Sequence, residues 1–126
     1  METGLYIVTL LYTPEGVGAG TMTIQLAVNT VNGTLHGQAH GIIHEGQAHQ
    51  LKFTATGDGH FYHTGVPPVT MIGGVKGKAV VSCIPPPIGS YLTEFSADFA
   101  VDDNWNGTGH FTVGTDTYKC KVTKVG

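Results

Sequence analysis

The fold is decided by the stretch Thr21–Asn29, which reads TMTIQLAVN. Met22, Ile24, Leu26 and Val28 alternate there with polar or small residues. A period of two places alternate side chains on opposite faces of a β-strand. The stretch therefore predicts a strand with one buried face and one solvated face.

The same alternation recurs along the chain, and no segment of ten or more residues shows helical periodicity. In residues 91–101, for example, Phe95, Ala97 and Phe99 share one face of the expected strand. We expect strands at residues 4–12, 20–29, 33–44, 47–57, 60–64, 69–73, 77–84, 91–101, 107–113 and 117–125.

Gly, Asn, Asp and Pro separate these strands by short loops, which is typical of an antiparallel meander. The length of 126 residues fits a single domain covering residues 1–126. An all-β meander of about eight to ten strands is predicted to close as a β-barrel, because closure removes exposed strand edges. A two-layer β-sandwich is the alternative.

Composition excludes several classes of partner. The formal net charge is −3, and all six basic residues are Lys. The lack of Arg argues against nucleic acids and strongly anionic ligands. No secretory signal is recognisable and no apolar stretch is long enough to span a bilayer, so we expect a cytoplasmic protein without a membrane partner. Cys83 and Cys120 are then expected to be buried free thiols.

Six of the seven His residues lie between positions 36 and 63. His36, His40 and His44 share one face of a strand at intervals of roughly 13 Å, which is too far for one metal ion. A turn at residues 45–47, with His44 opposite Ala48, places His36 and His40 on the solvated face, and Ile43 opposite His49. No metal or cofactor is predicted.

Asp98 and His110 are expected to face each other across neighbouring strands, with Ala97 near Phe111. Pairing of Phe111 with Cys120 would add Lys121 to the same row. This row falls on the polar face, so we interpret it as surface decoration and assign no catalytic residue. The segment from residue 73 to 78, GGVKGK, is expected to be a turn.

The lone Trp lies in a polar hairpin loop, DDNWNG. An exposed indole next to carboxylate and amide groups can stack on the C–H face of a sugar while its neighbours bind hydroxyls. The ligand-binding candidates are therefore Asp103, Asn104, Trp105 and Asn106. In the alternative interpretation, Trp105 folds back and closes one end of the barrel.

The expected inward face combines small residues with large aromatic ones. Gly37, Gly41 and Gly109 are small, whereas Phe53 and Phe111 are large. Complementary packing is the favoured interpretation, and a cavity for an apolar ligand is the alternative. In that case His49 and His63 are the candidate residues of an interior pocket.

Three segments resemble a known family. They are the opening TGLYIV from Thr3 up to Thr13-Pro14, the stretch Leu26–Val31, and the pattern Gly37-x-x-x-Gly41-Ile42. They resemble a bacterial family of small, glycine-rich all-β domains without assigned function. The resemblance covers roughly the first third of the chain. It implies a bacterial β domain and transfers no active residue.

These observations predict a non-catalytic binding module that recognises a carbohydrate or other small ligand through its hairpin loops. One alternative is a small barrel enzyme of the cyclase or isomerase kind, which would need an interior pocket with a polar group of perturbed pKa. The other is a structural protein that associates with itself as a homo-oligomer. Fold alone does not choose among them.

Overall fold

The computed structural model describes residues 4–15, 20–45, 49–83 and 89–125. No helix in these ranges is long and apolar enough to cross a membrane. The strands are β1 (Leu5–Pro14), β2 (Thr21–Asn29), β3 (Thr34–Glu45), β4 (His49–His63), β5 (Met71–Cys83), β6 (Ser90–Val101), β7 (Gly107–Val113) and β8 (Asp116–Lys124).

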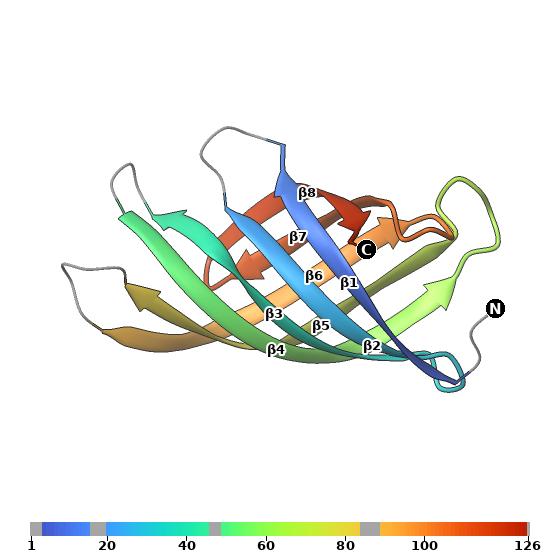
Figure 1. Ribbon diagram of the computed structural model, residues 1–126, viewed down its shortest axis with the longest axis horizontal. Coiled ribbons are helices and arrows are strands. Elements are labelled where there is room, and N and C mark those ends of the chain that lie inside the picture. Colours follow the sequence, from blue (N-terminus) through green and yellow to red (C-terminus); the bar gives the residue numbers. More distant parts are fainter. Residues whose placement is uncertain (1–3, 16–19, 46–48, 84–88, 126) are drawn as a thin grey trace.

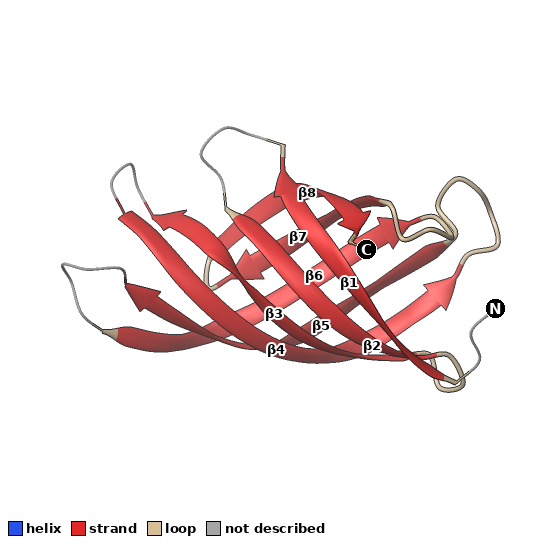
Figure 2. Cartoon of the chain, viewed as in Figure 1, coloured by secondary structure: helices blue, strands red, loops and turns tan. Residues whose placement is uncertain are grey.

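Each strand pairs in antiparallel fashion with the next one in the chain, and β8 pairs with β1 to close the barrel. Figure 1 shows the meander from blue β1 to red β8, and Figure 2 shows that strands make up almost all of it. The all-β barrel predicted from the alternation is confirmed, and the sandwich alternative is wrong. Closure pairs the two terminal strands, which would otherwise be open edges.

Two predicted breaks are absent, because β4 and β5 are each one long strand. The segment from residue 73 to 78 is part of β5, so its prediction as a turn is wrong. Gly77 of this segment allows β4 and β5 to approach each other closely. It pairs with Gly57, and a Cβ on Gly77 would collide with the Thr56 carbonyl oxygen. Glycine therefore lets the two strands bend together without ending either one.

Two predicted registers are shifted by two residues. Ile43 pairs with Leu51, not with His49. Phe111 pairs with Tyr118, not with Cys120, because a two-residue turn joins Val113 to Asp116 and Gly114 adopts a φ of 66° there. A shift of two preserves the face of every side chain, so the predicted inner and outer faces hold.

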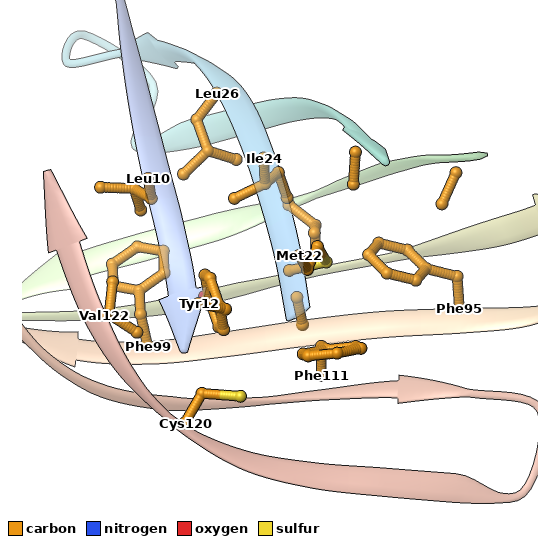
Figure 3. Close-up of a cluster of buried hydrophobic side chains, with 14 of the residues drawn as sticks. Leu10, Tyr12, Met22, Ile24, Leu26, Phe95, Phe99, Phe111, Cys120 and Val122 are labelled. Carbon is orange, nitrogen blue, oxygen red and sulfur yellow. The ribbon is translucent and has the colours of Figure 1, made fainter. Parts of the chain in front are cut away.

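The core fills the barrel interior with apolar and aromatic side chains. Phe111 lies near the centre, with ring centroids 4.9 Å from Tyr118 and 5.9 Å from Phe53. Figure 3 shows this cluster, with Leu10 from β1, Met22 and Ile24 from β2, and Phe95 from β6 pointing inward. The small residues make room for it: a Cβ on Gly41 would lie 2.9 Å from the Phe53 ring, and one on Gly109 would lie 3.0 Å from the Tyr12 ring. Complementary packing, the favoured interpretation of the small inward residues, is what these contacts show.

Candidate functional site

Few polar groups of the described residues reach the barrel interior. Among the described residues, no polar or charged residue is buried. The one polar atom aimed inward from β1 is the Tyr12 hydroxyl, which donates a hydrogen bond of 2.8 Å to the Asp98 carbonyl oxygen. Burial raises the pKa of the Tyr12 phenol far above its ordinary value of 10.0, and the nearby Asp98 carboxylate adds to the effect. This phenol stays neutral and is already hydrogen-bonded, so it offers no acid or base chemistry near neutral pH.

Of the two histidines predicted for an interior pocket, the structure describes the side chain of His63. His63 is exposed at the end of β4, so its prediction as a residue of an interior pocket is wrong. It has the same parity as buried Phe61 and its ring packs edge-on against that ring, with centroids 5.5 Å apart. His63 pairs with the buried Met71, so parity places it on the inner face of the sheet, although its own side chain is exposed. The side chain of His49 lies outside the described part of the structure.

Trp105 is buried rather than displayed. Only 4% of its surface is exposed, and its ring lies 5.4 Å from that of Phe99, centroid to centroid. A left-handed backbone conformation, with a φ of 64°, turns the indole back towards the barrel end. The exposed-platform interpretation of Trp105 is therefore wrong, and the alternative, a plug over one end, describes its position.

The polar groups around Trp105 hold the loop itself together. The Asp102 carboxylate accepts hydrogen bonds from the backbone amides of Asn104, at 2.8 Å, and Asn106, at 3.1 Å. Asp103 accepts one of 2.7 Å from the Thr70 hydroxyl, and the Asn106 side-chain oxygen accepts one of 3.2 Å from the Lys124 amide. Of the four predicted loop residues, only Asn104 is exposed without a side-chain hydrogen bond to another described residue. The loop is built as a cap.

Charged side chains pair across strands on the outer face. Asp98 and His110 face each other as predicted, with 3.2 Å between Oδ1 and Nδ1, but Lys119 rather than Lys121 lies opposite His110. The other described pairs are His36 with Asp58, Lys78 with Glu94, and Lys119 with Glu15. The pair of His36 and Asp58 was missed because the predicted register placed His36 beside Thr56.

The largest of the described depressions lies on the outer face of the barrel, where sequence reasoning placed no site. It has a volume of about 570 Å³, and its floor includes the buried Ala39 and Ala55. Two adjacent cross-strand rows line it. One row contains Thr9, Gln25, Gln38, Thr56 and Lys78, and the next contains Thr23, His40, Thr54, Val80 and Leu92. We call this depression the outer groove.

Half of the residues that line the outer groove carry uncharged groups that can both donate and accept hydrogen bonds. Six of its lining residues are Thr or Gln, each on an outward position of its strand, and Gln38 and Thr56 face each other directly. The strand alternation contains this signal, because outward Thr and Gln recur two residues apart, as in Thr23 and Gln25. The sequence does not show how the outward residues of separate strands align into rows. No group of three metal-ligating side chains comes together within the described ranges.

The comparison with known families covers most of the barrel. The model of a family described as a domain of unknown function, DUF1842, matches residues 3–118. The chain belongs to the DUF1842 family. The match extends the resemblance seen in the first third of the sequence through most of the strands of this DUF1842 barrel. No curated protein matches the chain. The bacterial origin that the resemblance implies stays a prediction.

Proposed function

We propose that this DUF1842 barrel is a non-catalytic binding module for a carbohydrate or a similarly small, neutral, polar ligand, and that the ligand lies in the outer groove. The observation that carries the proposal is the alignment of two outward rows, which brings six Thr and Gln side chains to one depression. Sequence alone placed the ligand at the 103–106 loop. The groove is the better location, because most polar groups of that loop are engaged within the fold.

The chemistry of the lining favours a neutral ligand with hydroxyl groups. Hydroxyl and carboxamide groups each supply donors and acceptors, which match the hydroxyls of a sugar. Val80 and Leu92 pair at one side of the groove and offer an apolar surface for the C–H face of a ring. The one Lys of the lining, Lys78, forms an ion pair with Glu94, so its charge is already compensated.

The size of the outer groove also suits a small ligand. Its volume of about 570 Å³ lies within the range of roughly 300–1,000 Å³ found for small-molecule sites. The four middle strands of the groove, β2 to β5, are paired on both sides over these rows, so most of the binding groups start from a rigid scaffold. A rigid scaffold lowers the entropy lost when a ligand binds.

The test compares two Thr→Val variants on the same outer face, using titration calorimetry against a panel of neutral mono- and oligosaccharides. Thr56→Val removes a hydroxyl from the middle of the groove, and Thr108→Val removes an exposed hydroxyl from β7, outside it. We expect Thr56→Val to weaken binding about tenfold, the cost of one well-placed hydrogen bond, and Thr108→Val to leave it unchanged.

Three results would overturn the proposal: no binding by the wild-type chain to any neutral saccharide on the panel, equal loss in both variants, or loss only on Asn104→Ala. The last result would return the site to the loop. Because all three positions are exposed, the substitutions test binding with little effect on folding. The predicted cytoplasmic location is a separate proposal, tested by fractionating cells that express the chain.

A further inference from the structure

The barrel seam between β1 and β8 is incomplete. β2 pairs with β1 from Leu5 to Tyr12, whereas β8 pairs with β1 only from Leu10 to Pro14. One further hydrogen bond, 2.9 Å from the Val125 amide to the Thr9 carbonyl, extends the seam by one residue. In Figure 1 the N-terminal half of β1 continues beside β2 beyond the arrowhead of β8. Residues 5–8 therefore form a strand edge with no neighbouring strand among the described residues.

The backbone groups that face this open edge can be assigned from two hydrogen bonds. Thr30 donates to the Gly4 carbonyl at 2.9 Å, so the peptide groups of Gly4 point towards β2. The Thr9 carbonyl accepts from Val125, so those of Thr9 point away from β2. Because the direction alternates along an antiparallel strand, the N–H and C=O groups of Leu5 and Ile7 point into the open edge.

The outward side chains along this edge are apolar and exposed. Leu5 is 69% exposed and Ile7 is 64% exposed. Residues 5–8 include no charged residue and no Pro, the features that usually protect a strand edge from pairing. An edge with free hydrogen-bonding groups and exposed apolar side chains is suited to strand addition.

We propose that this edge is a homodimer interface, in which Leu5–Ile7 of two copies pair in antiparallel fashion about a two-fold axis at Tyr6. In this register Leu5 of each copy lies opposite Ile7 of the other. Each such pair exchanges two backbone hydrogen bonds, so the two symmetric pairs satisfy all the free groups of Leu5 and Ile7. On the outer face, the exposed Leu5 and Ile7 of one copy meet Ile7 and Leu5 of the other.

A second copy is the occupant that this edge fits best, because the edge is complementary to itself. A two-fold interface requires the same patch on both copies. The free backbone groups belong to Leu5 and Ile7, which lie one residue on either side of Tyr6, so an axis at Tyr6 pairs them with each other. Both edges are uncharged, so the pairing brings no like charges together. The register also avoids Thr9, whose carbonyl is already used by Val125.

The test is sedimentation equilibrium of the full chain over a concentration series reaching about 1 mM, since a short edge interface is expected to bind weakly. The apparent mass of the wild type should rise towards twice the 13.2 kDa of one chain. Ile7→Lys should remain monomeric, because an edge Lys opposes strand pairing. Ile72→Lys is the matched control: Ile72 is 42% exposed on the outer face of β5, and strands flank it on both sides. It should dimerise like the wild type.

Hydrogen exchange measured by NMR locates the interface independently of mass. The amides of Leu5 and Ile7 should exchange at least tenfold more slowly in the concentrated wild-type sample than in a dilute one. Exchange in Ile7→Lys should not depend on concentration, and circular dichroism checks that this variant is folded. A monomeric wild type, equal loss of dimer in Ile72→Lys, or a dimer without protection of these two amides would overturn the proposal. So would a monomeric chain that captures an unrelated extended peptide at this edge.

Discussion

The Tyr12 hydroxyl donates a 2.8 Å hydrogen bond to the backbone carbonyl of Asp98, a residue 86 positions further along the chain. The bond links β1 to β6, two strands that are not neighbours in the sheet. Gly109 lies beside this path, and a Cβ there would come within 3.0 Å of the Tyr12 ring. The Asp98 carboxylate meanwhile accepts the His110 amide at 3.0 Å. Asp98 thus accepts hydrogen bonds from two other strands, through its backbone carbonyl from β1 and through its carboxylate from β7.

Tyr12→Phe should lower the free energy of unfolding by about 1–3 kcal/mol, because it removes a hydrogen bond from a carbonyl inside the barrel. Urea denaturation followed by circular dichroism measures this. Tyr62→Phe is the control, since Tyr62 is 67% exposed and its hydroxyl is in contact with solvent. Equal stabilities of the two variants would show that the bond to Asp98 contributes nothing.

Cys120 should make stability depend on pH in the alkaline range. Burial, with a smaller contribution from Glu15, raises the pKa of its thiol from 9.0 to about 11. The unfolded chain therefore loses this proton near pH 9, and the folded chain keeps it until about pH 11. Stability is fully present below pH 9 and falls as the pH rises towards 11, by up to about 3 kcal/mol in total.

Urea denaturation at a series of pH values measures this dependence. Cys120→Ala should remove the decline between pH 9 and pH 10, below the range in which the raised pKa of Tyr12 contributes, whereas Thr108→Val, which changes no titratable group, should run parallel to the wild type. Parallel profiles for Cys120→Ala and the wild type would show that this thiol is not the source of the alkaline decline.

Trp105→Ala should destabilise the barrel by about 3–5 kcal/mol, because it removes a large buried ring that packs on Phe99. Thermal and chemical denaturation measure the loss, with exposed Asn104→Ala as the neighbouring control. As the only Trp of the chain, Trp105 should also emit at the short wavelengths typical of a buried indole. Emission like that of free Trp in water would contradict the plug.

Gly77→Ala and Gly57→Ala should differ sharply although the two glycines pair with each other. A Cβ on Gly77 would collide with the Thr56 carbonyl oxygen, so we expect a loss of roughly 3 kcal/mol or more. A Cβ on Gly57 would lie no closer than 3.2 Å to its neighbours, so a loss of about 1 kcal/mol is expected. The midpoints of urea denaturation decide this, and similar midpoints would rule out close strand approach at Gly77.

Much of the barrel follows from local pattern. The inward positions of Ile24, Phe95 and Phe99, and the outward positions of Gln38 and His40, were all predictable from parity. The registers of the strand pairs could not be predicted in this way. A shift of two residues leaves every side chain on its face, and only the geometry of the turn decides which register forms. The left-handed Gly114 makes the turn between β7 and β8 short, and this places Lys119 rather than Lys121 opposite His110.

Functional residues were less predictable than the fold. Trp105 reads as exposed because its sequence neighbours are polar, but those neighbours bond to one another and to Thr70 and Lys124. The outer groove joins residues from β1 to β6 that share no local motif. Its Thr and Gln side chains become a site only when their rows align.

The sequence by itself determined most of the strands, their two faces and the antiparallel meander, because side-chain alternation and short turns act over a few residues. Only the tertiary structure decided the registers, the burial of Trp105, the bond from Tyr12 to Asp98 and the open edge at Leu5 and Ile7. These depend on how distant strands meet when the barrel closes, which no local pattern encodes.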